Sequence, residues 1–178
     1  MLKQNIFVMT GPSGVGKSVL VNRLIESGLV KRCITCTTRQ MRSGETPGVD
    51  YHFYSEAVFS DKVSKGEFLE VNQHYENWYG VRHQDIDAML DQHNVVLLLN
   101  WEGALKIKAD YPNAMTIFLE PPSLQILEKR LKNRDDSAKR MVYAHEDMQH
   151  VDDFDYRLLN DNIDKTFDML CEIIHEAG

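Results

Sequence analysis

Residues 11–18 read Gly-Pro-Ser-Gly-Val-Gly-Lys-Ser, a complete GxxxxGK[ST] phosphate-binding loop. The loop follows a short apolar run at 6–9 and precedes a segment with apolar residues at helical spacing: Val19, Leu20, Leu24 and Ile25. A strand, a glycine-rich turn and a helix in this order predict a site where backbone N–H groups and the helix N-terminus bind nucleotide phosphates. The alternative is an ordinary glycine-rich turn before a helix, but such a turn does not require a Lys-Ser pair in register.

The residues of the loop have distinct expected roles. The glycines let consecutive N–H groups turn inward on a phosphate. Lys17 is expected to reach the β- and γ-phosphates and Ser18 Oγ to ligate Mg²⁺, so the loop predicts a purine triphosphate as phosphate donor. The complete expected ATP-binding set is Gly11, Ser13, Gly14, Val15, Gly16, Lys17 and Ser18.

Length and composition indicate one domain. The chain has 178 residues, of which 43% are apolar, enough for one hydrophobic core. A formal net charge of −7 argues against non-specific binding to nucleic acid or to an acidic membrane. No apolar run approaches the ~20 residues of a membrane span, and the N-terminus lacks a signal-peptide pattern. We therefore expect a cytoplasmic protein that binds neither nucleic acid nor membranes.

The cysteines are Cys33, Cys36 and Cys171. An odd number in a chain without secretory features predicts reduced thiols. Cys33 and Cys36 have the spacing of half a zinc site, but no second cysteine pair or suitably spaced histidine pair completes it. We expect no metal bound through cysteine.

The hydrophobic pattern changes along the chain. Gly28 is expected to end the first helix, and residues 39–50 have no periodicity and are typical of a functional loop. Short predicted strands make up a small mixed β region at residues 33–37, 51–54, 67–71 and 78–81.

From residue 84 onward, helices and strands alternate as a parallel α/β sheet requires. The run 95–99 is apolar on both faces, which is typical of a central parallel strand. Ser123 can cap the helix that follows it, and the last helix carries an apolar stripe. The expected elements are helix 84–92, strand 95–99, helix 103–110, strand 115–119, helix 123–133 and a C-terminal helix with Ile163, Phe167, Leu170 and Ile174 on one face.

Further motifs occur in a fixed order: Thr37-Thr38-Arg39, Arg42-Ser43-Gly44-Glu45, Gly48-Val49-Asp50-Tyr51-His52-Phe53, Gly66-Glu67-Phe68-Leu69-Glu70 and Tyr79-Gly80. Together with the phosphate loop, they resemble the guanylate kinase family over nearly the whole chain. The resemblance implies a nucleoside monophosphate kinase that transfers the ATP γ-phosphate to GMP with Mg²⁺. It also implies a three-layer α/β P-loop fold with a parallel core sheet (1–32, 83–131 and 141–178), a small mixed β monophosphate-binding region (33–82) and a short lid (132–140).

The resemblance implies roles for individual residues. Glu70 matches the carboxylate that accepts hydrogen bonds from guanine N1–H and the exocyclic amine, and Thr35 matches a base-contacting hydroxyl. Four residues match the positions that hold the acceptor phosphate, and arginine forks suit a dianion because they donate bidentate bonds. These are Arg39, Arg42, Tyr51 and Tyr79; the arginines expected to close over the phosphates with Lys17 are Arg130, Arg134 and Arg140.

The chain departs from the family in three places. Where the family has Asp-x-Asp after the central strand, this chain has Leu98 and Asn100, so a base-recognising acid and a magnesium-organising acid are both replaced. Asn100 keeps one acceptor oxygen, and Glu102 could return a carboxylate to the metal. Val81 stands where the family has a base-contacting Thr or Ser. The segment between Arg134 and Arg140 is shorter than the usual lid, which puts the placement of Arg140 in question.

Two other functions compete with GMP phosphorylation. One is a guanylate-kinase-like binding module with little or no activity, which the replaced acids favour. The other is a kinase for a different phosphorylated small molecule, which Leu98 and Val81 favour. An intact Lys17 and Ser18 favour an enzyme, since a pure binding module has no need for a triphosphate loop.

Overall fold

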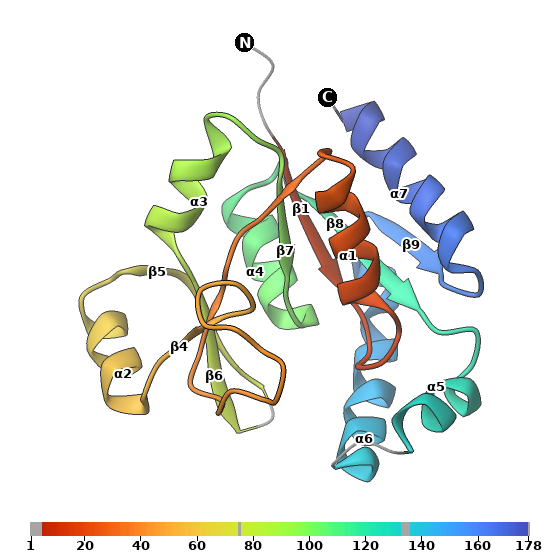
Figure 1. The fold of residues 1–178 in the computed structure, drawn as a ribbon, viewed down its shortest axis with the longest axis horizontal. Coiled ribbons are helices and arrows are strands. Elements are labelled where there is room, and N and C mark those ends of the chain that lie inside the picture. Colours follow the sequence, from red (N-terminus) through yellow and green to blue (C-terminus); the bar gives the residue numbers. More distant parts are fainter. Residues whose placement is uncertain (1–4, 75, 133–135, 178) are drawn as a thin grey trace.

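The computed structural model describes residues 5–74, 76–132 and 136–177 (Figure 1). Its centre is a five-stranded sheet in which all neighbouring strands are parallel. The strands in sheet order are β2 (Lys31–Arg32), β7 (Val95–Leu98), β1 (Ile6–Thr10), β8 (Met115–Glu120) and β9 (Tyr156–Leu159).

Helices cover both faces of this sheet, so the core has the three predicted layers (Figure 1). On one face, α1 (Lys17–Glu26) and α7 (Ile163–Ala177) bury Leu20, Leu24 and Leu170 against Phe7 and Met9 of β1. Successive residues of a strand point to opposite faces. Ile6 and Val8 therefore pack on the other side, with α3 (His83–Leu90) and α4 (Trp101–Asp110).

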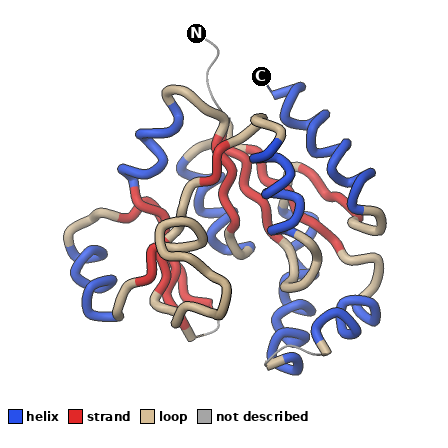
Figure 2. The backbone as a smooth tube through the Cα atoms, viewed as in Figure 1, coloured by secondary structure: helices blue, strands red, loops and turns tan. Residues whose placement is uncertain are grey.

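A second, four-stranded sheet lies beside the core. Its order is β4-β3-β6-β5, with β3 parallel to β4 and the other pairs antiparallel, so it is mixed as predicted. Figure 2 shows that the segment joining β3 to β4 is loop throughout. The elements of this part are β3 (Cys36–Thr37), β4 (His52–Phe53), α2 (Glu56–Ser64), β5 (Phe68–His74) and β6 (Asn77–Arg82).

Helices lie in the described parts of the chain between β8 and β9. Ser123 caps α5 (Leu124–Leu131) as predicted, because its Oγ accepts from Ile126 N at 3.2 Å. α6 (Ser137–Asp147) follows and continues into a 3₁₀ helix, Met148–Asp153. This path brings α6 back beside the sheet, where it approaches the phosphate-binding loop (Figure 1).

The structure corrects the predicted elements in several places. The single strand expected at 33–37 is wrong: residues 31–32 pair with β7 in the large sheet, whereas 36–37 pair with β4 and β6 in the small one. The chain therefore changes sheets between residues 32 and 36. The sequence analysis also missed three elements. These are α2, which buries only Phe59, α6, which begins inside the segment expected to be the lid, and β9, a sheet-edge strand directly after Asp155.

The cysteines lie in apolar surroundings. Cys33 and Cys36 are buried, and burial raises the pKa of both thiols to about 12. Among the described residues, no cluster of three His, Cys, Asp or Glu side chains is placed to bind a metal ion. Within the same residues, none of the helices combines the length and the apolar character needed to cross a bilayer.

Candidate active site

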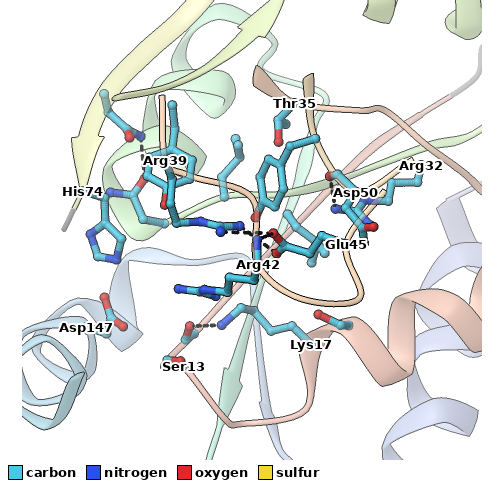
Figure 3. Close-up of a pocket in the computed structure, with 18 of the residues that line it drawn as sticks. Ser13, Lys17, Arg32, Thr35, Arg39, Arg42, Glu45, Asp50, His74 and Asp147 are labelled. Atoms are coloured by element: carbon cyan, nitrogen blue, oxygen red, sulfur yellow. Dashed lines mark hydrogen bonds and ion pairs between the residues drawn. The ribbon is translucent and has the colours of Figure 1, made fainter. Parts of the chain in front are cut away.

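One cleft gathers most of the residues selected from the sequence (Figure 3). It lies where the parallel strands end, the edge at which open α/β sheets bind their ligands. Its walls come from the phosphate loop and α1, the β3–β4 loop, the strands β5 and β6, the segment after β7, and α6. The lining residues are Gly11, Ser13, Lys17, Ser18, Asn22, Arg32, Thr35, Arg39, Arg42, Glu45, Asp50, Tyr51, Asn72, His74, Tyr79, Leu98, Leu99, Asn100, Arg140 and Asp147.

The phosphate loop has a backbone that only glycine fits. Gly11 has φ +130°, and a Cβ there would lie 2.3 Å from the Leu119 carbonyl oxygen. Gly16 has φ +114°, and a Cβ there would lie 2.6 Å from Asn160 Nδ2. Asn160 also donates to the Val15 carbonyl at 2.7 Å, so β9 and the segment after it fix the loop from behind. The loop therefore has a defined shape before α1 begins at Lys17.

Two cations reach this loop. Lys17 Nζ donates to the carbonyl oxygens of Gly11 and Pro12, the latter at 2.9 Å. Arg140, on α6, donates from Nη1 to Ser13 Oγ at 2.9 Å. The short segment before α6 therefore does not keep Arg140 away from the phosphate loop.

A second cationic group lies across the cleft on the β3–β4 loop. Arg39 forms a bidentate pair with Glu45, with distances of 2.7 Å from Nη2 to Oε1 and 3.1 Å from Nη1 to Oε2. The backbone N–H of Arg42 also donates to Glu45 Oε2, at 2.7 Å. Burial alone would raise the pKa of Glu45, but the bonds from Arg39 and Arg42 outweigh it and hold that pKa below its ordinary value. Glu45 thus fixes the side chain of Arg39 and the backbone of Arg42 in the loop.

The two tyrosines expected at the acceptor phosphate lie beside these arginines. The rings of Tyr51 and Tyr79 are 6.2 Å apart in an edge-on arrangement, and the Arg39 guanidinium lies 5.4 Å from the Tyr51 ring centre. Figure 3 shows the guanidinium groups of Arg39 and Arg42 and the ammonium group of Lys17 directed into the same space. This arrangement can hold two phosphate groups side by side.

The other end of the cleft is less polar. Thr35 and Leu98 line it, whereas Val81 is fully buried and packs into the core with Leu97 and Ile86. Glu70 lies behind this wall with 2% of its surface exposed. Neither carboxylate oxygen accepts a hydrogen bond of ordinary geometry from the described residues, although the Asn72 amide lies close to the carboxylate. Burial raises the pKa of Glu70 to about 7, although the neighbouring Asn72 amide opposes the shift.

Asn100 has a structural role that the sequence analysis did not predict. It caps α4, with Oδ1 accepting from Gly103 N at 3.1 Å. The same oxygen accepts from Asn72 Nδ2, and Asn100 Nδ2 donates to Glu102 Oε2 at 3.2 Å. Asn100 lines the cleft, but Glu102 does not.

The expected arginines differ in what the structure says of them. Arg130 is exposed on α5 and is not among the lining residues. Arg134 lies outside the residues that the structure describes. Arg140 is therefore the arginine of this predicted group that the structure places at the phosphate loop.

Asn72, His74 and Asp147 are among the lining residues that the sequence analysis missed. Asn72 and His74 follow Glu70 at every second position of β5, so the period of the strand could have indicated them. Asp147 lies two helical turns after Arg140 on α6 and shares its face. Burial and the charge of Lys17 lower the pKa of His74 to about 4, and burial raises that of Asp147 to about 6 although Lys17 opposes this shift.

Comparisons with known proteins agree with this geometry. Residues 3–177 match the sequence model of the family described as guanylate kinase. A guanylate kinase of Methylobacillus flagellatus is 38% identical over 180 aligned positions, covering 97% of this chain and 89% of that protein. A guanylate kinase of Aliivibrio fischeri is 40% identical over 173 positions, covering 92% and 84%. The crystal structure of guanylate kinase from Anaplasma phagocytophilum superposes with a TM-score of 0.85 at 28% identity, covering 99% of this chain and 87% of that one. The chain belongs to the guanylate kinase family.

Proposed function

We propose that this chain transfers the γ-phosphoryl group of ATP to GMP, giving ADP and GDP. The observation that carries the proposal is that a triphosphate-binding loop and an arginine–tyrosine site for a second phosphate open into one cleft. Phosphoryl transfer needs little covalent chemistry from the protein, because positioning and charge neutralisation supply most of the catalysis. Since both substrates are nucleotides of the cell interior, we place the enzyme in the cytoplasm.

ATP would bind at the phosphate loop. The N–H groups of the loop and the N-terminus of α1 would hold the β-phosphate, and Lys17 would exchange its carbonyl contacts for phosphate oxygens. The donor set here also fits Mg²⁺, which keeps several waters and binds phosphate oxygens with few protein ligands. We assign Ser18 Oγ as its protein ligand rather than Asn100, whose Oδ1 already accepts two hydrogen bonds. Bound there, Mg²⁺ would neutralise charge on the transferring phosphate.

GMP would bind across the cleft. Arg39 and Arg42 would hold its phosphate as charge-assisted donors, with the hydroxyl groups of Tyr51 and Tyr79 beside them. Glu70 and Thr35 lie at the base end, where an ionised carboxylate can accept from guanine N1–H and the 2-amino group. Adenine does not present that pair of donors on the same edge.

Residues 33–82 and 132–140 would move towards the core when both nucleotides are bound. Closure would exclude water from the phosphates, and Arg140 already links α6 to Ser13 of the phosphate loop. The arginines at 130 and 134 would complete the charge around the transferring group in the closed form. The core in this scheme comprises residues 1–32, 83–131 and 141–178.

A kinase for a different phosphorylated acceptor is the second candidate. It is favoured by Leu98, an apolar residue that lines the cleft, because a small acceptor without a purine would not require a polar wall. The phosphate-binding half of the site would be unchanged in such an enzyme.

The test is a coupled assay that measures ADP release from ATP and Mg²⁺ with GMP, dGMP, AMP, UMP, CMP and ribose phosphates. We expect GMP to have the highest kcat/KM, and a folded Lys17→Ala protein to show no turnover. A preference for ribose phosphates would support the second candidate. Tight binding of ATP or GMP without turnover of any acceptor would indicate a binding module instead.

A further inference from the structure

One face of β5 supplies three polar side chains to the site. Glu70, Asn72 and His74 alternate with residues on the opposite face, and Asn72 and His74 line the cleft. Asn72 pairs across the sheet with Tyr79, and Glu70 with Val81. Asn72 therefore lies between the buried Glu70 and the open part of the cleft.

The orientation of the Asn72 amide is fixed by a chain of hydrogen bonds. Glu102 Oε2 accepts from Asn100 Nδ2, which leaves Asn100 Oδ1 to accept from Gly103 N–H. Asn72 Nδ2 donates to that same Oδ1. The reverse orientation of the Asn72 amide would place two oxygen atoms against each other, so Nδ2 must face Asn100.

The oxygen of this amide is left as an acceptor. Asn72 Oδ1 is buried and has no hydrogen-bond partner among the described residues. Leaving a buried acceptor unpaired typically costs about 1–3 kcal/mol, so its presence in a binding cleft points to a donor on the ligand.

Asn72 is also a direct neighbour of the expected base-reading carboxylate. A Cβ built on Gly103 would lie 2.7 Å from Asn72 Nδ2 and 2.9 Å from Glu70 Oε1, so the two side chains meet at the first turn of α4. Guanine presents one N1–H and two hydrogens on its 2-amino group. A carboxylate that accepts N1–H and one amino hydrogen leaves the other amino hydrogen without an acceptor, and Leu98 cannot provide one.

We propose that Asn72 Oδ1 accepts a hydrogen bond from the 2-amino group of the guanine base, beside Glu70, and thereby makes Asn72 a specificity-determining residue. The proposal rests on the proposed function for the identity of the base. Leu98 stands where the family has a base-recognising acid, and the proposal assigns that role to the neutral amide of Asn72 on β5. Asn100 and Glu102 hold this amide in place.

The test compares GMP with IMP, whose base lacks only the 2-amino group. For Asn72→Ala, we expect kcat/KM for GMP to fall about 10-fold to 100-fold and kcat/KM for IMP to change less than about 3-fold, because the lost bond is made by that amino group alone. Gln73→Ala is the matched control, since Gln73 is exposed on the opposite face of β5. An equal fall for both nucleotides, or no fall for either, would overturn the proposal.

Two further measurements keep the test decisive. If the protein turns over neither nucleotide, the proposed function fails, but calorimetric binding of GMP and IMP to the wild-type and Asn72→Ala proteins still tests the contact. If the variant does not fold, the side-chain carbonyl carbon of Asn72 can be followed by NMR in the unaltered protein. We expect GMP to shift this resonance and IMP to leave it in place; identical responses to the two nucleotides would contradict the contact.

Discussion

The two ends of the cleft are built on opposite principles. At the phosphate end the charged groups already have partners: Arg39 is held by Glu45, Arg140 by Ser13, and Lys17 by carbonyl oxygens of its own loop. At the base end, the carboxylate oxygens of Glu70 and the Oδ1 atom of the half-buried Asn72 are buried acceptors without a hydrogen-bond partner among the described residues. The cations of the phosphate end can exchange these partners for the oxygens of any suitable anion. The acceptor oxygens of the base end gain hydrogen bonds only from a ligand with donors in the right places.

This difference separates affinity from selectivity. Phosphate groups are common to all nucleotides, so contacts to them add to affinity without distinguishing the bases. A ligand without donors binds weakly beside buried unpaired acceptors. It loses its own hydration on binding, and the acceptors remain without hydrogen bonds. Variants at the two ends should therefore fail in different ways.

The largest effect is expected from Lys17→Ala. Loss of the lysine removes a preorganised positive charge from the transferring phosphate, so we expect kcat to fall at least about 10³-fold with every acceptor. Because Lys17 also bonds to Gly11 and Pro12, the melting temperature should fall by a few degrees at most. Steady-state kinetics and thermal unfolding monitored by circular dichroism measure the two effects. Near-normal turnover in a folded variant would contradict the assignment of the donor site.

Arg39→Ala is expected to have the next largest effect. The variant removes two donors from the acceptor phosphate and leaves Glu45 without its bidentate partner, so KM should rise about 10²-fold. The rise should be the same for GMP, dGMP and AMP, so their preference ratios should not change. Arg23→Ala is the control, since Arg23 pairs with Asp164 away from the cleft. A changed ratio between bases would break the proposed separation of the two ends.

Glu70→Gln should change the preference between bases and leave binding of the phosphate group largely unchanged. Replacing one acceptor oxygen with an amide leaves the guanine donors poorly matched, so we expect the preference for GMP over AMP to fall about 10-fold, mainly through the GMP value. KM values for the two nucleotides, measured side by side at pH 8, give the ratio. An unchanged ratio would show that Glu70 does not contact the base.

The same substitution should stabilise the protein above neutral pH. Burial raises the pKa of Glu70 from 4.5 to about 7, so the folded state binds this proton more tightly than the unfolded state. The free energy of unfolding therefore decreases as pH rises from 4.5 through 7. The uncharged Gln side chain of Glu70→Gln does not titrate, so its free energy of unfolding does not decrease in this way. We expect the variant to be more stable than wild type at pH 8 by up to about 3 kcal/mol. Urea unfolding at pH 4.5 and pH 8 tests this; an equal difference at both values would contradict it.

The sequence predicted one end of the cleft better than the other. The phosphate loop depends on local geometry, so its motif alone located Gly11, Lys17 and Ser18. The strand period could have placed Asn72 on the cleft face, but the orientation of its amide depends on a hydrogen bond to Asn100, which in turn donates to Glu102. Both partners come from a distant segment, and no local pattern reveals them. The single strand predicted at 33–37 was wrong for a similar reason: residue propensity does not show that the chain leaves one sheet for another.

Asn100→Asp should have the smallest effect on turnover. It tests whether residue 100 caps α4 at the base end or organises Mg²⁺ at the phosphate end. A carboxylate can still accept from Gly103 N–H and Asn72 Nδ2, so α4 should remain capped and kcat should change less than about 3-fold. The new charge lies close to Glu102, whose own charge already raises the pKa of Glu70.

A second nearby charge should raise the pKa of Glu70 further. As pH falls, KM for GMP should therefore begin to rise at a higher pH than in wild type. The Mg²⁺ concentration for half-maximal rate should not change. Glu102→Gln should move that pH downward, because it removes the nearby charge instead of adding one. These opposite shifts are measured from kcat/KM profiles between pH 5.5 and 9 at saturating ATP. If Asn100→Asp instead lowers the Mg²⁺ requirement and leaves the pH profile in place, residue 100 organises the metal at the phosphate end, and the cleft is not divided as we propose.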